Sequence, residues 1–149
     1  MSAEERVRLR RETVGMVHQN DALVEEFTAA ENVALPMEIR GVHTATALAL
    51  AEKELSRVGL ADLPGRYPRM LSGGQRQRVG IARALAGDRS VLLADEPTGA
   101  VDSVNASVIY ELLAKIAVDG ALVVVASHDP QCREYANRVI EMRDGHLVG

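Results

Sequence analysis

The chain has 149 residues, an apolar content of 47% and a formal net charge of −4. This composition supports the packed core of one ordinary domain, and the acidic balance argues against a general nucleic-acid-binding surface. No apolar run approaches the roughly 20 residues that a membrane-spanning helix needs, so any membrane role must come through a partner. The single cysteine, Cys132, cannot form an internal disulfide, which fits a reducing cytoplasm.

The first half of the chain predicts mostly helical structure. Its arginine-rich opening, residues 6–11, is expected to be a solvated helix or a frayed segment. Residues 13–19 alternate enough to be a strand, and this strand ends in a glutamine. Farther along, Gly59 is placed to end a helix, and residues 62–69 read as an irregular connection. One face of that helix is expected to hold Leu48, Ala51, Leu55 and Val58.

Residues 71–79, Leu-Ser-Gly-Gly-Gln followed by Arg-Gln-Arg-Val, are the most informative stretch of the sequence. Ser72 and the two glycines after it stand where a helix is expected to start. A hydroxyl and bare backbone N–H groups would then point outward at the positive end of the helix dipole, an arrangement that binds phosphate. The structural alternative is that Ser72 only caps a helix after a Gly-Gly turn.

Two apolar runs predict strands of a parallel sheet, each buried on both faces. The first, residues 91–94, ends in Asp95 and Glu96, and adjacent carboxylates are costly there unless a cation or a reaction needs them. The alternative is a solvated acidic turn. The second run, residues 121–126, leads to His128 at the carboxyl end of a strand, where open α/β sheets bind ligands.

Three further elements complete the prediction. Ser103 is a plausible N-cap for an amphipathic helix that packs on the sheet. A short helix is expected over residues 131–135, and residues 138–148 predict a hairpin around the turn dipeptide Asp144-Gly145. The packing face of the long helix is expected to hold Val104, Val108, Leu112 and Ile116.

Taken in order, these motifs resemble those of the ATP-binding-cassette (ABC) ATPases. Residues 71–75 resemble the signature motif, residues 91–96 the Walker B motif, and residues 98–102 the D-loop. His128 stands at the place of the H-loop histidine, and Gln19 at that of the Q-loop glutamine. The sequences of residues 31–37, 96–99 and 141–145 resemble those of the lipoprotein-releasing and macrolide-exporting subgroup. Two departures are His18, where an aromatic residue is frequent, and Val101, where leucine is commoner.

The resemblance implies ATP and Mg²⁺ as cofactors and a role for each motif residue. Asp95 would hold Mg²⁺ through its water shell, and Gln19 would touch the ion or its water. Glu96 would orient and deprotonate the attacking water, and His128 would contact the γ-phosphate. Asp102 would lie at a dimer interface. The signature residues that would bind an ATP held by a partner cassette are Ser72, Gly73, Gly74 and Gln75.

The resemblance also implies a fold and its division. We expect an α/β P-loop NTPase core with a mostly parallel sheet, an α-helical subdomain carrying the signature motif, and a C-terminal β-hairpin. Residues 1–19 and 88–149 would form the core, and residues 20–87 the helical subdomain. Residues 31–37 would join the two.

No Walker A motif, which ends in Gly-Lys-Ser or Gly-Lys-Thr, occurs in the sequence. We therefore expect an N-terminally truncated nucleotide-binding domain that is inactive alone. The family places the Walker A strand between the strand ending near Ala126 and the one around residues 138–142. Without it we expect a closed-up sheet, completion by another chain, or a marginal and poorly soluble fold.

The predicted function is that of an ATPase subunit that powers export or lipoprotein release. Its expected partners are a second ABC ATPase subunit, identical or not, and a transmembrane permease, at the cytoplasmic face of the membrane; no nucleic acid is expected. One alternative is a degenerate, non-catalytic subunit that supplies only its signature face. A DNA-repair ATPase lobe is disfavoured, because Gln19 and Leu71 are joined by a compact segment without sustained heptads.

Overall fold

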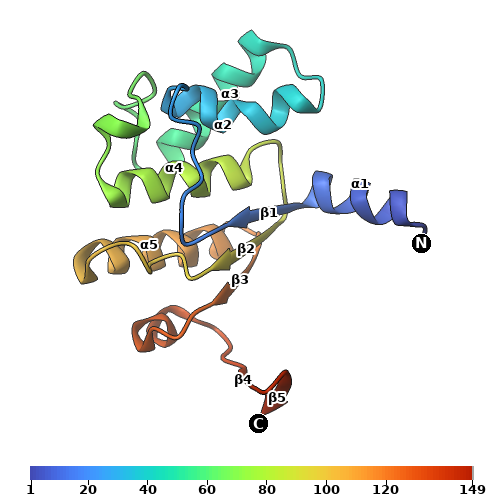
Figure 1. The fold of residues 1–149 in the computed structure, drawn as a ribbon, viewed down its shortest axis with the longest axis vertical. Helices are drawn as coiled ribbons and strands as arrows, with labels where there is room; N and C mark the ends of the chain where they lie inside the picture. The colour runs from blue at the N-terminus through green and yellow to red at the C-terminus, as the bar shows by residue number, and fades with distance from the viewer. Residues whose placement is uncertain (149) are drawn as a thin grey trace.

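The computed structural model describes residues 1–148 and is built around a three-stranded parallel sheet (Figure 1). Its strands are β1 (Val14–Val17), β2 (Val91–Asp95) and β3 (Leu122–Ala126), in the order β1-β2-β3. Because the strands are parallel, their carboxyl ends lie at one edge of the sheet. The apolar runs thus form the strands that their composition predicts.

One face of this sheet is covered by helices. Helix α4 (Gly73–Leu85) contacts β1, and helix α5 (Ser103–Val118) contacts β3. Leu92, in the central strand, is completely buried on this face. The register places Gly15 and Val123 beside it, so the three residues form one inward-facing row.

The opposite face is largely bare, which corrects the prediction of strands buried on both faces. Met16, Leu93 and Val124 are register partners on this side. Met16 is 50% exposed and Val124 49% exposed. β3 consequently alternates between exposed and half-buried positions along its whole length. Such alternation is typical of a sheet with helices on only one side.

Three helices pack together above the covered face (Figure 1): α2 (Ala29–Ile39), α3 (Thr44–Arg57) and α4. Thr28 starts α2 with a capping box, in which its side chain and that of Glu31 each accept the other residue's backbone N–H. The segment 31–37, expected as a connection, therefore lies inside a helix. The side chains that are fully buried in this layer include Val33, Ala51, Leu55, Val79 and Ile81.

Helix α5 forms as predicted, but its cap and its packing face differ from the prediction. Asp102, not Ser103, is the N-cap, since its carboxylate accepts the backbone N–H of Asn105. Val104 is 74% exposed, because a stripe with steps of four residues drifts about 40° per step around a helix of 3.6 residues per turn. The buried face mixes steps of three and one and consists of Ala106, Ile109, Tyr110, Leu113 and Ile116.

The two ends of the chain lie away from this core (Figure 1). Helix α1 (Ala3–Thr13) has no buried residue and projects from β1, as expected of a solvated helix. Between β3 and the C-terminal strands the predicted short helix forms as a 3₁₀ helix, Pro130–Tyr135. A shorter 3₁₀ segment, Pro68–Met70, overlaps the end of the predicted irregular connection.

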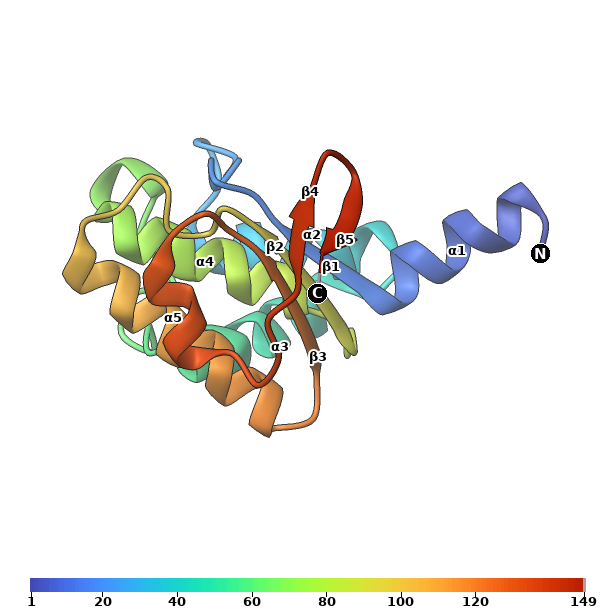
Figure 2. The same cartoon turned by 90° about the horizontal axis from the view of Figure 1, so that it is seen from below.

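The predicted hairpin forms from β4 (Glu141–Arg143) and β5 (His146–Val148) (Figure 2). Asp144 and Gly145 make its turn, both with positive φ. Within residues 1–148, β4 pairs only with β5, and β3 pairs only with β2. The closed-up sheet is therefore not the outcome. No helix of the described part combines the length and apolar character needed to cross a membrane.

Candidate functional site

The predicted nucleotide-site residues meet at the carboxyl edge of the sheet. Gln19 lies two residues beyond β1, Glu96 directly follows β2, and His128 lies two residues beyond β3. The backbone N–H of Glu96 donates to the carbonyl of Ala126 at 2.8 Å, which extends the sheet by one bond and fixes Glu96 beside the end of β3. The fold therefore brings together residues that lie more than a hundred positions apart.

Glu96 and His128 are in direct contact. One oxygen, Oε1, accepts the backbone N–H of His128 at 3.1 Å and lies 2.5 Å from the Nδ1 atom of its ring. The other, Oε2, accepts the hydroxyl of Ser127 at 3.3 Å. The His128 side chain is 91% exposed, so its outer edge faces solvent.

Glu96 also has an unusual backbone conformation. Its φ of +46° lies in the left-handed region, which non-glycine residues avoid at a cost of order 1–3 kcal/mol. Such outliers gather at functional sites, where the surrounding structure holds them in place. Here the backbone bond to Ala126 and the three bonds to the carboxylate supply that restraint.

Gln19 packs against the turn at residues 96–99, and Asp95 directly precedes this turn. Asp95 is exposed at the end of β2. The Gln19 side chain packs against Gly99 so closely that a Cβ on Gly99 would lie 2.7 Å from Gln19 Nε2. Gly99 is thus required for this close approach. Among residues 1–148 no group of three His, Cys, Asp or Glu side chains gathers as a metal site.

The signature residues start α4 as predicted. Ser72 is the N-cap: its Oγ accepts the backbone N–H of Gln75 at 3.2 Å, and Gln75 Oε1 accepts the backbone N–H of Ser72 at 2.9 Å. Ser72 thus caps the helix, but the cap uses only one lone pair of the hydroxyl, which keeps its own proton to donate. Capping and phosphate binding are compatible at this residue.

Gly74 lies against the first turn of α5, which follows the predicted D-loop. A Cβ on Gly74 would lie 2.4 Å from Oδ1 of Asn105, so the absence of a side chain here makes room for α5. Asn105 in turn donates its backbone N–H and its side-chain amide to Asp102, each at 2.9 Å. These bonds lower the pKa of the Asp102 carboxyl. Gly73, in contrast, remains exposed.

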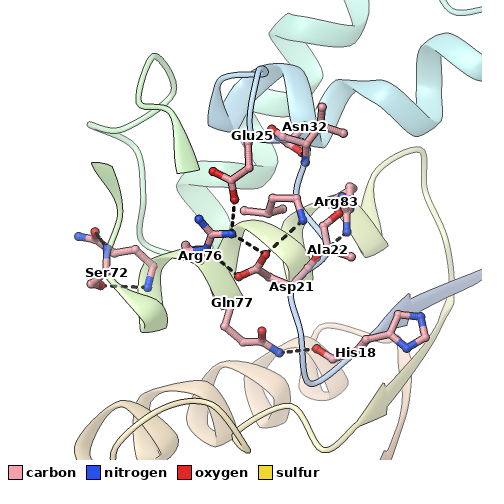
Figure 3. Close-up of polar contacts among 12 residues, drawn as sticks. His18, Asp21, Ala22, Glu25, Asn32, Ser72, Arg76, Gln77 and Arg83 are labelled. Carbon is pink, nitrogen blue, oxygen red and sulfur yellow. Dashed lines mark hydrogen bonds and ion pairs between the residues drawn. The ribbon is translucent and has the colours of Figure 1, made fainter. Parts of the chain in front are cut away.

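Arginines of α4 hold the loop that follows Gln19 (Figure 3). Arg76 donates to both carboxylate oxygens of Asp21, at 2.8 and 3.1 Å, and to Glu25 at 2.7 Å. Arg83 donates to the backbone carbonyl of Asp21 at 2.7 Å, and Gln77 to that of His18 at 3.1 Å. We call the Arg76–Asp21–Glu25 group the loop clamp. It ties the segment carrying Gln19 to α4, the helix that Ser72 caps.

The loop clamp changes the acidity of its members. Partial burial alone would raise the pKa of Asp21, but the hydrogen bonds from Arg76 and the Leu23 backbone outweigh it and the pKa is lowered. The hydrogen bonds to Asp21 and Glu25 raise the pKa of Arg76. Both groups are therefore held in their charged forms, as expected of a bidentate arginine–carboxylate pair.

Several residues of this region escape prediction from sequence. Asp21 and Arg76 are 55 positions apart, and no local pattern links them. Asn105 carries a weak signal, since polar residues in a first helical turn favour caps. Tyr110 carries a clearer one: it is the polar-tipped aromatic on the apolar face of α5, and a buried tyrosine hydroxyl needs a partner.

Comparisons with known proteins place the chain in a family. The family model described as "ABC transporter" matches residues 1–99. The macrolide export ATP-binding/permease protein MacB 1/2 of Paracoccus denitrificans is 45% identical over 99% of this chain, and MacB of Escherichia coli K12 is 43% identical over the same share. Each alignment covers less than a quarter of the relative, 22% and 23%.

Solved structures match the whole fold. The dimeric structure of MJ0796, described as a bacterial ABC transporter cassette, superposes with a TM-score of 0.82 at 37% identity. A post-hydrolysis state of MJ0796 bound to ADP and phosphate gives the same TM-score at 36% identity. In both cases the match covers 99% of this chain and 66% of the MJ0796 chain. The α/β ABC ATPase fold is confirmed.

Proposed function

We propose that this chain, which belongs to the ABC transporter family, supplies the signature, Walker B, D-loop and H-loop parts of an ATPase that powers export through a membrane partner. The observation that carries the proposal is the Glu96–His128 contact at the carboxyl edge of the sheet, 2.5 Å between Oε1 and Nδ1. A base and an orienting imidazole at this edge suit hydrolysis of a bound nucleotide. The relatives named as macrolide exporters favour export over lipoprotein release.

The residues at the sheet edge suit Mg²⁺ and the attacking water. Asp95 offers an exposed carboxylate and Gln19 a carboxamide oxygen, and Mg²⁺ typically takes few protein ligands and keeps water and phosphate for the rest. Bound there, Mg²⁺ would neutralise phosphate charge. Glu96 would take the proton of the attacking water, while the exposed ring of His128 would hold the γ-phosphate.

Ser72, Gly73, Gly74 and Gln75 would act on a nucleotide held by a second cassette. In this proposal the free proton of the Ser72 hydroxyl donates to the γ-phosphate, at the positive end of the α4 dipole. The description of MJ0796 as dimeric supports such pairing. Asp102, which lies beside Gly74 through Asn105, would face the same interface.

The membrane partner is proposed to be a permease at the cytoplasmic face, since the MacB relatives are named as joined ATP-binding and permease proteins. Residues 20–87 would form the helical subdomain and residues 1–19 and 88–149 the nucleotide-binding core. The chain alone is proposed to hydrolyse ATP negligibly, because its sequence contains no Gly-Lys-Ser or Gly-Lys-Thr to grip the phosphates. Robust ATP turnover by the pure chain, abolished by Glu96→Gln, would contradict the proposed inactivity of the chain alone.

A chimera tests the assigned roles. A segment carrying a Walker A motif, taken from a complete ABC cassette, is joined ahead of Met1, and ATP-dependent dimerisation and turnover are measured. Glu96→Gln should bind ATP and form a stable dimer without turnover, since it keeps the side-chain size and loses the base. Ser72→Arg should fail to dimerise, because a long cation cannot fit where a hydroxyl meets phosphate.

Ser2→Arg is the matched control for this experiment. Ser2 caps α1 with the same kind of capping box, formed with Glu5, but lies away from the sheet edge. The Ser2 variant should dimerise and turn over ATP like the unmodified chimera. Equal dimerisation of Glu96→Gln and Ser72→Arg would contradict the roles. A different outcome would favour the non-catalytic subunit. In that case the unmodified chimera would not hydrolyse ATP at its own site, and the Glu96→Gln chimera would still stimulate hydrolysis by a competent partner cassette.

A further inference from the structure

Tyr110 brings a hydroxyl group into the core beneath the strand ends. Its side chain is 1% exposed on the packing face of α5, and its ring stacks on Tyr135 with the ring centroids 5.7 Å apart. A tyrosine hydroxyl buried without a partner would cost about 1–3 kcal/mol. Tyr110 avoids that cost by bonding to residues that follow two different strands.

Three polar side chains surround the hydroxyl. It donates to Asp129 Oδ2 at 3.0 Å and lies 2.8 Å from Thr98 Oγ1 and 3.4 Å from Ser127 Oγ. Because its single proton goes to Asp129, it accepts the Thr98 proton. Burial raises the pKa of Tyr110, which keeps that proton in place. Thr98 follows β2, whereas Ser127 and Asp129 follow β3.

Asp129 links these bonds to the Glu96–His128 contact through Ser127. Ser127 Oγ donates to Glu96 Oε2 at 3.3 Å and accepts the backbone N–H of Asp129 at 3.1 Å. Asp129 is also fixed from the other side, where its Oδ1 accepts the backbone N–H of Gln131 at 3.0 Å. His128 itself is 91% exposed, so little packing holds its ring. Its position therefore depends on the turn formed by residues 127–129.

We propose that Tyr110 is a positioning residue, whose buried hydroxyl locks the turn at residues 127–129 to the turn at residues 96–99 and so holds His128 against Glu96. Tyr110 touches neither Glu96 nor His128 and acts through Asp129, whose backbone N–H donates to Ser127. Its importance for ATP hydrolysis rests on the proposed function. The positioning itself is independent of ATP and is measured without it.

The test is amide hydrogen exchange of the full chain, followed residue by residue by NMR. Tyr110→Phe removes the hydroxyl and keeps the ring. The His128 amide, which donates to Glu96, and the Asp129 amide, which donates to Ser127, should exchange at least about tenfold faster, equivalent to about 1.4 kcal/mol. Rates within about twofold of the unmodified chain at both amides would overturn the proposal.

Tyr135→Phe is the matched control. It removes a hydroxyl from the other ring of the stacked pair without touching Thr98, Ser127 or Asp129. This variant should leave the His128 and Asp129 amides unchanged. Equal acceleration by the two phenylalanine variants would show that ring packing, and not the Tyr110 hydroxyl, sets the turn, and would also overturn the proposal.

A double-mutant cycle keeps the proposal falsifiable if Tyr110→Phe loosens the whole fold. Thr98→Val removes the partner at the other end of the network and leaves Tyr110 bonded to Asp129. The double variant should accelerate His128 exchange no more than Tyr110→Phe alone; independent, multiplied effects would contradict a shared network. The two proposals can fail separately. If Tyr110→Phe speeds exchange but Glu96→Gln leaves ATP turnover by the chimera unchanged, the positioning role is retained and the ATPase proposal is rejected.

Discussion

The two faces of the sheet differ in how far they are covered by helices. On the covered face, Leu92 is fully buried beneath helices, and the three-helix layer above it holds side chains such as Leu55 with no exposed surface. On the bare face, Leu122 is 61% exposed and Val124 49% exposed. The same residue types therefore contribute very differently to stability, according to the face on which they lie.

The backbone repeats this contrast. Leu122 donates to the carbonyl of Ser90, and Ala126 accepts the N–H of Glu96, so alternate residues of β3 bond to β2. The alternation of a parallel ladder then directs the N–H groups of Val123 and Val125 to the other edge. No strand within residues 1–148 pairs with that edge. Unpaired edges recruit other chains, which leaves completion by a partner or marginal stability as the expected outcomes.

A pair of leucine truncations should show the difference between the covered and the bare side most clearly. Leu55→Ala, in the helical layer, should lower the free energy of unfolding by about 2–5 kcal/mol, since it removes a fully buried side chain and leaves a cavity. Leu122→Ala, on the bare face, should cost less than about 1 kcal/mol. Urea denaturation measures both. Equal losses would mean that the bare face is covered in solution.

The loop clamp should respond to a smaller change. Arg76→Gln leaves Asp21, whose side chain is 19% exposed, without its cation and should cost about 1–3 kcal/mol. Arg8→Gln serves as the control, since Arg8 pairs with Glu12 in an i,i+4 bridge on the exposed helix α1, and its loss should cost about 0.3–0.5 kcal/mol. Unfolding free energies of both variants at low and high salt check this. Indistinguishable losses would show that the clamp adds nothing to an ordinary surface pair.

The pH dependence of the clamp should give the smallest effect. Because the folded pKa of Asp21 lies below the ordinary aspartate value of 3.8, its ionised form stabilises the fold above that pH. This contribution should be lost as the pH falls through the lowered folded pKa. The difference in unfolding free energy between the unmodified chain and Asp21→Asn should thus be constant near neutral pH and shrink below about pH 4. A difference that grows on acidification would contradict the assigned direction.

The sequence anticipates the positions of elements better than their contacts. The strands could be predicted because continuous apolar runs such as residues 91–94 and 121–126 end in polar motifs, and a parallel sheet then brings Glu96 and His128 to one edge. The family and the α/β fold, inferred from those motifs, are confirmed. The roles of all the predicted site residues stay predictions: Gln19, Ser72, Gly73, Gly74, Gln75, Asp95, Glu96, Asp102 and His128.

What the sequence does not reveal depends on three-dimensional placement. Steps of four residues from Val104 to Ile116 suggest a packing face, but the helix drifts away from it and buries Tyr110 instead. Asp21 and Arg76 are brought together only by the folding of the loop onto α4. The sequence also does not reveal that one side of β3 is bare, because residues 122–126 have the apolar composition of a strand covered on both faces.

Amide hydrogen exchange on the purified chain tests the contrast between the two faces most directly. The amide of Ile81, in the middle of α4, should exchange slowly, near the limit set by global unfolding. The amides of Val123, at the unpaired edge of β3, and of Val139, before the hairpin, should exchange at rates close to those of an unfolded chain. Strong, uniform protection of Val123 and Val139 in a soluble monomer would contradict the account.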